Sequence, residues 1–329
     1  MRLTRLLAVL ALAFNCTALV AASKDHPAYT DPEHADADFA VQGEYRGEVR
    51  SEGKKDIWGA QVIALGSGKF HAVGYKGGLP GDGWNEKDKK QADGQTEGDA
   101  TRFQTEHHHL AIRDGVMTVS DSGGERVGEL KKVHRQSPML GAKPPAGAVV
   151  LLGGSSVEHF PGGRMTEDGL LMQGAKSKET FGSFTCHLEF RLPYMPTARD
   201  QGRGNSGLYL QGRYEVQMLD SFGLEGQDNE CGGLYKIAAP RINMCYPPLA
   251  WQTYDVDYTA AVFQDDKKVK NARATVRHNG VVIHDHAELT HIVGGNVLDE
   301  GPEPGPIFLQ NHGNPVRYRN IWVVHKQAP

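Results

Sequence analysis

The sequence predicts an all-β protein, in which a jelly-roll β-sandwich is preceded by a smaller antiparallel β domain. Gly and Pro are abundant, at 40 and 17 of 329 residues. Short runs of β-branched and aromatic residues alternate with turn signals, and no long helical stripe follows the N-terminus. A hydrophobic fraction of 39% is enough for one large domain or two smaller ones with real cores.

Residues 1–22, MRLTRLLAVLALAFNCTALVAA, have the layout of a secretory signal peptide. Arg2 and Arg5 precede an apolar run, and small residues lead to a cleavage point near Ala22 or Ser23. A transmembrane anchor or a lipoprotein through Cys16 fits less well, because the apolar run is short and polar residues interrupt it. We therefore expect an exported protein, periplasmic or extracellular, with no integral membrane segment after signal cleavage.

The charge of the chain argues against a nucleic-acid partner. Removal of residues 1–22 takes away two Arg and leaves 34 basic and 40 acidic residues, a formal net charge of −6. A mildly acidic surface offers no electrostatic footprint for nucleic acid or anionic lipid.

Three cysteines remain after cleavage, and an oxidising compartment would permit one disulfide. Cys186 lies in an apparent core strand, FTCHLEF, so the spacing favours Cys231–Cys245 across a loop without fixing the pair. C-x13-C with no nearby partner is a poor zinc signal.

Four segments follow the signal peptide. Residues 23–42 are polar and predict a loose leader, and residues 43–135 predict a small β domain of unknown role. Within that domain, GGLPGDGW (77–84) and the charged stretch NEKDKKQADGQTEGD that follows it predict a long exposed loop. Residues 136–149 are a Pro-rich linker. Residues 150–326 predict the jelly-roll domain, in which Asn279–Gly280 marks a tight hairpin turn.

One strand of that domain carries more polarity than a core strand needs. In NSGLYLQGRYEVQMLDSFG (205–223), Glu215 and Gln217 are two apart and share a face. Asp220 joins them only if the strand bulges, which would let all three line one concave surface. The alternative is that Glu215 and Asp220 flank a solvent-facing strand edge.

Further polar groups stand near the ends of other predicted strands. They are Asn205, Gln211, Arg213, Lys236, Gln310 and His312. Several sequence-distant polar residues of this kind exceed what solubility requires, and together they predict a site.

The motifs HLEFRLP, RGNSGLYLQGRYEVQMLDSFG, NECGGLY, WQTYDVDY and GPIFLQNHGNPVRYRNIW resemble the 3-keto-disaccharide hydrolase domain family over roughly residues 150–326. The resemblance implies the concanavalin A-like lectin/glucanase sandwich. Residues 43–147 resemble an N-terminal extension that accompanies this domain in some exported bacterial proteins. The run E-x-Q-x-x-D also resembles the E-x-D-x-x-E strand of laminarinase-type glycosidases on the same fold. Its departures put ordinary retaining hydrolysis in doubt, because that mechanism needs two carboxyl groups about 5–5.5 Å apart.

The resemblance implies an enzyme that cleaves 3-keto-glycosides or disaccharides. A ketone at C3 acidifies the C2 proton, so a base can start an elimination that hydration completes as a net hydrolysis. Glu215 is the first candidate for the catalytic carboxylate, Asp220 the second, and His312 the candidate proton donor or base. Lys236 or a bound divalent cation would polarise the ketone, although no metal-ligand spacing requires a cofactor. The expected substrate-binding residues are Asn205, Gln211, Arg213, Gln217, Lys236 and Gln310.

Two other readings stay open from sequence. A non-catalytic, lectin-like carbohydrate-binding protein would use the same fold. An ordinary laminarinase-type glycosidase would use the same strand.

Overall fold

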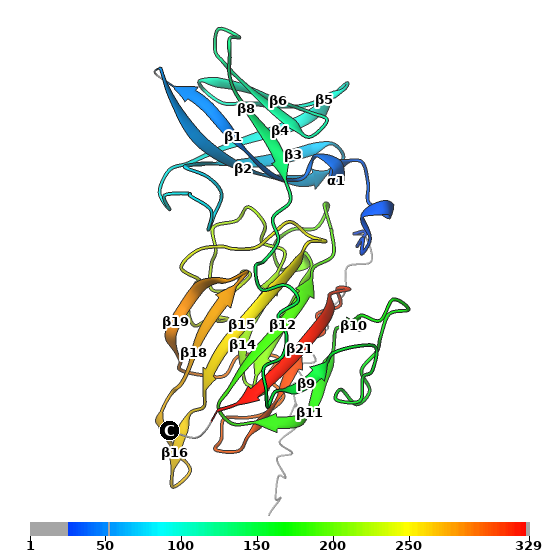
Figure 1. Cartoon of the computed structure of the whole chain (residues 1–329), viewed down its shortest axis with the longest axis vertical. Coiled ribbons are helices and arrows are strands. Elements are labelled where there is room, and N and C mark those ends of the chain that lie inside the picture. The colour runs from blue at the N-terminus through cyan, green and yellow to red at the C-terminus, as the bar shows by residue number, and fades with distance from the viewer. Residues whose placement is uncertain (1–25, 52, 327–329) are drawn as a thin grey trace, which may run out of the picture.

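The computed structural model of the protein describes residues 26–51 and 53–326. The predicted signal peptide, residues 1–22, lies outside the described residues. The fold is all-β, as the sequence predicts, with a small β domain at one end of a β-sandwich (Figure 1).

The small domain is a closed antiparallel barrel of eight strands. Each strand pairs with the next in the chain, and β1 closes the ring on β8. Inward-facing apolar side chains such as Val62, Phe70 and Phe103 fill its interior. The strands are β1 (Gly43–Ser51), β2 (Lys54–Gly66), β3 (Lys69–Lys76), β4 (Lys89–Glu97), β5 (Ala100–Gln104), β6 (His108–Arg113), β7 (Val116–Asp121) and β8 (Arg126–Val133).

Strand β4 corrects the expectation of an exposed loop within residues 85–99. Lys89–Glu97 pairs with β3 on one side and β5 on the other. Its inward positions are small, because Phe103 occupies the space they leave: a Cβ on Gly94 would come within 2.4 Å of the Phe103 ring. A strand that contributes space rather than apolar bulk has no hydrophobic alternation to find in the sequence.

The leader is more ordered from residue 26 onward than its composition suggested. It contains η1 (Pro32–His34) and α1 (Asp38–Val41). Tyr29 pairs through its backbone with Tyr194 of the sandwich, and their rings stack at 5.8 Å. Asp38 accepts a hydrogen bond from the Gly68 N–H of the barrel.

The sandwich consists of two packed antiparallel sheets. One has the order β10–β21–β12–β15–β18–β19, with β9 beside β21, and the other has the order β11–β20–β13–β14. A separate hairpin is formed by β16 and β17. The first sheet contains β9 (Val149–Leu152), β10 (Leu171–Met172), β12 (Phe184–Arg191), β15 (Trp251–Thr259), β18 (Ala272–His278), β19 (Val281–Leu289) and β21 (Arg317–His325). The second contains β11 (Ala175–Phe181), β13 (Asn205–Leu210), β14 (Tyr214–Leu219) and β20 (Gly305–Leu309), while the hairpin is β16 (Val262–Gln264) and β17 (Lys267–Lys270) and η2 is Asp200–Gly202.

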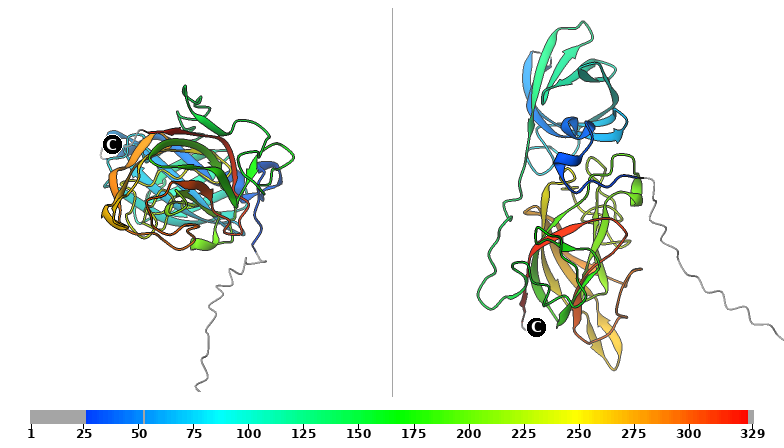
Figure 2. Two further views of the ribbon diagram at one scale, coloured as in Figure 1. Left: turned by 90° about the horizontal axis from the view of Figure 1, so that it is seen from below. Right: turned by 90° about the vertical axis from the view of Figure 1, so that its right-hand side faces the viewer.

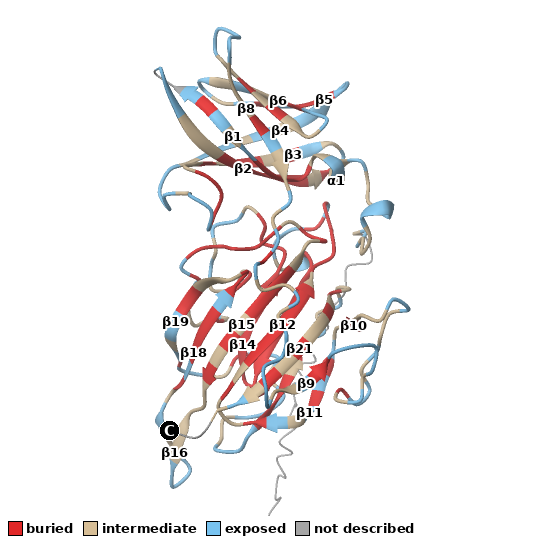
Figure 3. Cartoon of the chain, in the orientation of Figure 1, coloured by how far each residue is buried: buried red, intermediate tan, exposed pale blue. Residues whose placement is uncertain are grey.

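The main core lies between these two sheets, and β12, β14 and β15 are mostly buried (Figure 3). The predicted turn at Asn279–Gly280 is confirmed: both residues have positive φ, 51° and 82°, and join β18 to β19 with His278 opposite Val281. These are the dihedral signs that a tight primed hairpin requires.

The barrel and the sandwich share apolar contacts at the end where they meet (Figure 2). Ile63, Val73 and Tyr75 of the barrel belong to the main core, and Tyr194 of the sandwich belongs to the barrel core. Ion pairs such as Lys89–Glu225, at 2.6 Å, lie around this contact.

The linker after β8 crosses the outer face of the larger sheet. The Gly141 N–H donates to Glu189 at 2.6 Å, and Ala142 accepts from the Trp322 indole at 3.2 Å. The linker covers Glu189, and burial alone would raise the pKa of this acid. His187, at 3.8 Å, and hydrogen bonds from Asn320, Gly141 and Arg319 hold that pKa at about 2.

In the core, the Cys231 thiol lies 3.3 Å from the Tyr254 hydroxyl and the Cys245 thiol lies 3.6 Å from the Leu219 carbonyl. Cys186, Cys231 and Cys245 are all free. A disulfide between Cys231 and Cys245 stays a prediction. No helix in the described part of the chain is long and apolar enough to cross a membrane.

Candidate active site

The hairpin of β13 and β14 has one apolar face and one polar face. Its register places Tyr209 opposite Glu215 and Gly207 opposite Gln217. Successive residues alternate between faces, so one set packs into the main core while the other faces away from it. The core set is Leu208, Leu210, Val216 and Met218. The polar set is Asn205, Gly207, Tyr209, Glu215 and Gln217.

Glu215 is not on a free strand edge. Residues 232–235 run along β14: the Tyr235 N–H donates to the Glu215 carbonyl at 3.0 Å, and the Gln217 N–H donates to Gly233 at 2.9 Å. Only 3% of Glu215 is exposed. The solvent-edge reading of this carboxylate is therefore wrong.

The two carboxyl oxygens of Glu215 differ in their surroundings. Oε2 accepts a hydrogen bond from the Tyr209 hydroxyl at 2.9 Å. Oε1 has no hydrogen-bond partner among the described residues, yet it is not one of the fully buried unpartnered atoms, so it retains contact with solvent. Gly207 provides the space beside Oε1, because a Cβ there would come within 2.0 Å of it.

Burial raises the pKa of Glu215 to about 8, and the hydrogen bond from Tyr209 opposes that shift. The carboxyl group therefore exchanges its proton near neutral pH, which is where general acid–base catalysts work best. This is the most distinctive chemical property of the face.

Tyr209 lies at the centre of a small hydrogen-bond network. Its hydroxyl is 2.7 Å from the Gly294 carbonyl and 2.9 Å from Glu215, and it accepts from the Gln310 amide at 3.3 Å. The loop residue Gly295 covers it closely, since a Cβ there would lie 2.5 Å from the hydroxyl. One hydroxyl proton serves two acceptors, so the direction of donation follows the charge of Glu215.

Gln217 and Asn205 form an amide cluster beside Glu215. The Gln217 amide donates to Gln201 Oε1 at 3.2 Å, and the Asn205 amide donates to the Gln201 carbonyl at 3.0 Å. Asn205 Oδ1 is buried without a hydrogen-bond partner. This cluster can offer both donors and acceptors to hydroxyl groups.

Gln211 and Arg213 lie at the β13–β14 turn, away from the Glu215 carboxyl. Their side chains already form hydrogen bonds with other groups of the protein. The Gln211 amide donates to the Phe181 carbonyl at 2.8 Å. Arg213 donates to the carbonyls of Asp299 and Glu303, at 2.7 and 3.0 Å, and so holds the loop before β20 against the hairpin. Direct sugar binding by these two residues stays a prediction.

Lys236 and His312 lie on loops next to the site strands. Lys236 is exposed, has a positive φ of 56°, and places its amine 5.4 Å from the Tyr235 ring centre. His312 follows β20, is partly exposed, and has no hydrogen bond or ion pair within the described part of the chain. Neither forms a hydrogen bond or ion pair with Glu215, and their roles stay predictions.

Asp220 does not join the Glu215 face through a bulge. The β13–β14 register is continuous to Leu219, and Asp220 follows the strand end. It is fully buried and lies 3.5 Å from Arg203 Nε. Its charge opposes ionisation of the core thiols of Cys231 and Cys245, which places it on the core side. Burial raises its pKa, and the charge of Arg203 opposes that shift.

Three aromatic residues of this face were not predicted from sequence. Tyr209 sits between Glu215 and Phe308, with ring centres of Tyr209 and Phe308 5.5 Å apart. Tyr235 lies on the other side of Glu215, and it and Phe308 are partly exposed. The period-two spacing of Phe308 and Gln310 was the available signal, because it puts an aromatic and an amide on one face.

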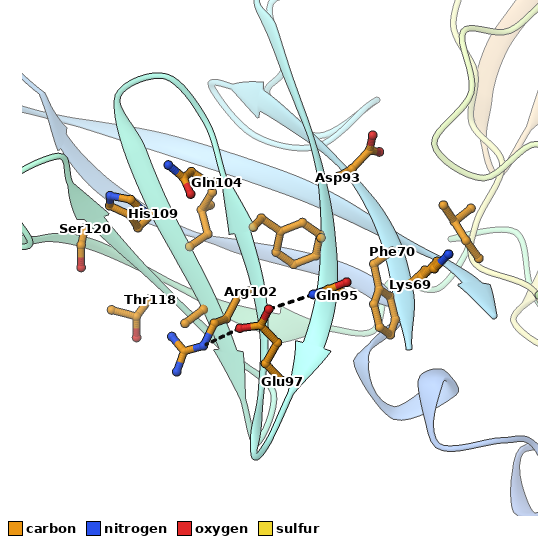
Figure 4. Close-up of a pocket in the computed structure, with 15 residues that line it drawn as sticks. Lys69, Phe70, Asp93, Gln95, Glu97, Arg102, Gln104, His109, Thr118 and Ser120 are labelled. Carbon is orange, nitrogen blue, oxygen red and sulfur yellow. Dashed lines mark hydrogen bonds and ion pairs between the residues drawn. The ribbon is translucent and has the colours of Figure 1, made fainter. Parts of the chain in front are cut away.

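The described residues contain no group of three or more His, Cys, Asp or Glu arranged to hold a metal ion. Two hollows, each of about 700 Å³, lie on the barrel rather than at Glu215. The first runs past Lys69, Arg102 and His109 (Figure 4). The second is lined by Lys132, whose pKa burial lowers to about 8. We take Glu215 as the first candidate because its face combines a perturbed acid with amide and aromatic side chains.

Comparison with known proteins identifies the family of the sandwich. The profile of the 3-keto-alpha-glucoside-1,2-lyase-like domain matches residues 147–324. A solved structure from Parabacteroides distasonis ATCC 8503, described as a candidate glycosyl hydrolase, is 32% identical with a TM-score of 0.50 and covers 55% of this chain and 85% of its own. A second such structure from that organism is 18% identical with a TM-score of 0.39, covering 55% and 95%. No curated protein matches the chain.

The fold and the comparisons define a carbohydrate hydrolase. The chain belongs to the 3-keto-alpha-glucoside-1,2-lyase-like domain family, as the sequence motifs had suggested.

Proposed function

We propose that this protein is an exported enzyme that cleaves the glycosidic bond of 3-keto-glycosides, with Glu215 as the base that removes the C2 proton. The observation that carries the proposal is the state of Glu215: a buried carboxyl with a pKa of about 8, held at Oε2 by Tyr209 and open at Oε1 beside Gly207. Oε1 is the oxygen that would meet the substrate.

The reaction would proceed by elimination. Glu215 takes the proton from C2, and the C–H electron pair forms an enolate with the C3 ketone. When the ketone re-forms, a C1=C2 double bond forms, and the C1–O bond breaks with its electron pair on the departing oxygen. That oxygen takes up a proton. Water then adds its hydroxyl to C1 and a proton to C2, which completes a net hydrolysis.

Other side chains of the face suit the remaining needs of this reaction. Gln310, Gln217 and Asn205 supply amide groups for sugar hydroxyls or the enolate oxygen. Tyr235 and Phe308 supply partly exposed rings against which a pyranose can pack. Lys236 and His312, on loops next to the site strands, would polarise the ketone or protonate the departing oxygen.

An ordinary retaining glycosidase is a poorer fit. That mechanism needs a second carboxyl group across the sugar from the first. Asp220, the second carboxylate of the strand, is fully buried on the core side with Arg203. Of the two carboxylates of this strand, only Glu215 retains contact with solvent, which suits proton abstraction better than double displacement.

Turnover in deuterated water tests the proposal directly. A 3-keto-glucoside and its parent glucoside are incubated with the wild type and Glu215→Gln. We expect aglycone release only from the keto sugar, deuterium at C2 of the product, and loss of release in the variant. Release from the plain glucoside would support a conventional glycosidase instead, and binding without release would support a lectin. Retention of hydrogen at C2 would rule out elimination.

A further inference from the structure

A row of arginines crosses the end of the larger sheet, on its outer face. Arg191 of β12 pairs in register with Arg317 of β21 on one side and Trp251 of β15 on the other. Arg319, two residues on from Arg317, lies on the same face. We call Arg191, Arg317, Arg319 and Trp251 the arginine row.

The row has few partners for its charge. Arg191 has no hydrogen bond or ion pair within the described residues. Arg317 donates only to the neutral acceptors Gln173 Oε1, at 3.2 Å, and the Val316 carbonyl. Arg319 alone has an acid, Glu189, at 2.6 Å. Of the five donors that each guanidinium carries, most of those on Arg191 and Arg317 are available.

This arrangement is costly unless something compensates it. Like charges directly opposite on neighbouring strands repel each other. Burial lowers the pKa of both Arg191 and Arg317. The charge of Arg319 adds to the shift of Arg191, and the charge of Arg191 adds to the shift of Arg317. The charge of Asp168 opposes the shifts of both Arg191 and Arg317, and that of Asp31 opposes the shift of Arg191, but neither acid forms an ion pair with either arginine. The rest of the chain is acidic overall.

The ring of Trp251 holds the arginine row in place, and the linker leaves the row uncovered. The guanidinium carbons of Arg319 and Arg191 lie 4.0 and 5.1 Å from the centre of the Trp251 ring. The linker covers the next rows of the same face, where Ser137 contacts Thr253 and Gly141 contacts Glu189. Arg191, Arg317 and Trp251 all remain partly exposed.

We propose that the arginine row binds an oxyanion, the carboxylate or sulfate ester of an acidic saccharide, away from Glu215 on the opposite sheet. Arginine forks match the planar, bidentate acceptors of these groups, and an anion would relieve the repulsion between Arg191 and Arg317. The saccharide part of the proposal rests on the proposed function, whereas the oxyanion site itself does not.

Calorimetric titration tests this site. The wild type is titrated with inorganic sulfate, a uronate-containing oligosaccharide, a sulfated oligosaccharide and a neutral oligosaccharide. We expect an acidic oligosaccharide to bind at least 10-fold more tightly than the neutral one. Whichever of the uronate and the sulfated oligosaccharide binds more tightly identifies the preferred anionic group. The variants Arg191→Gln and Arg317→Gln should each weaken that binding at least 10-fold. Arg273→Gln, an exposed arginine of β18 that pairs with Glu288, is the matched control and should change nothing.

The proposal fails if acidic and neutral oligosaccharides bind equally, or if the control variant weakens binding as much as the row variants. If inorganic sulfate binds and no acidic oligosaccharide does, the row is an oxyanion site that does not bind saccharides. The Glu215→Gln variant separates the two sites: it should lose turnover and keep acidic-saccharide binding. Thermal unfolding without ligand checks that the row variants fold, and removal of one repelling charge should leave their Tm equal to or above that of the wild type.

Discussion

Tyr209 donates to Glu215 across 2.9 Å from a position with no solvent exposure of its own. The same hydroxyl lies 2.7 Å from the Gly294 carbonyl. When Glu215 is ionised, the Tyr209 proton points to the carboxylate. When Glu215 is protonated, its own proton can point to Tyr209, whose proton then points to Gly294. The pair can therefore satisfy both protonation states of the acid without moving a side chain.

Turnover should depend on the ionisation of Glu215. Because burial raises the pKa of this acid to about 8, a base role requires activity to rise with pH and level off above that value. We expect kcat/KM on a 3-keto-glucoside to be about 100-fold lower at pH 6 than on the plateau. A rate profile that stays flat from about pH 6 to 9, or that falls with pH, would exclude Glu215 as the base.

Removal of the Tyr209 hydroxyl should move that profile. The hydrogen bond from Tyr209 lowers the pKa of Glu215, so Tyr209→Phe should raise the midpoint of the kcat/KM profile by roughly 0.5–1 pH unit. Tyr214→Phe is the matched control, since Tyr214 is equally buried on the same hairpin but donates to Glu300. A purely structural role for Tyr209 would lower activity at every pH and leave the midpoint unchanged.

The buried carboxyl should also cost stability. The folded-state pKa of Glu215 is raised above its ordinary value of 4.5, so its contribution to stability is complete below about pH 4 and is lost as pH rises through about 8. Glu215→Gln should therefore raise the free energy of unfolding on the order of 2–4 kcal/mol at about pH 9, with little change at about pH 4.

Denaturant unfolding at the two pH values measures this difference. Glu106→Gln, which removes an exposed carboxylate, should show no such pH-dependent gain. An unfolding free energy of Glu215→Gln that matched the wild type at both pH values would mean that the acid is well solvated or paired in the folded state.

The sequence predicted the elements of the sandwich because they follow simple periodic rules. Leu208, Val216 and Met218 alternate with polar partners, and that alternation identified β13 and β14 as well as the shared face of Glu215 and Gln217. Asn279–Gly280 required a primed turn because few other dipeptides accept positive φ twice.

Other features depend on contacts that spacing does not encode. Asp220 could share the face of Glu215 only through a bulge in β14, and the continuous register of β13 and β14 shows that there is none. The role of Tyr209 depends on the Gly294 carbonyl, which is 85 residues away in the chain. The closure of eight strands into a barrel depends on β4. Its inward residues Ala92 and Gly94 are too small to give a recognisable hydrophobic alternation in the sequence.

Gly207 should be required for activity more than for folding. It lies opposite Gln217 in β13 with an ordinary strand conformation, but an added Cβ would come within 2.0 Å of Glu215 Oε1. Gly207→Ala must therefore displace the carboxyl from the position that would meet C2 of the substrate, and a displacement of about 1 Å costs roughly 100-fold in rate. Steady-state turnover of a 3-keto-glucoside measures the effect, and thermal unfolding shows whether the variant folds. Gly182→Ala is the matched control, because no atom lies within 4 Å of the Cβ that it would add. A folded Gly207→Ala variant with wild-type turnover would mean that Oε1 is not the reacting oxygen.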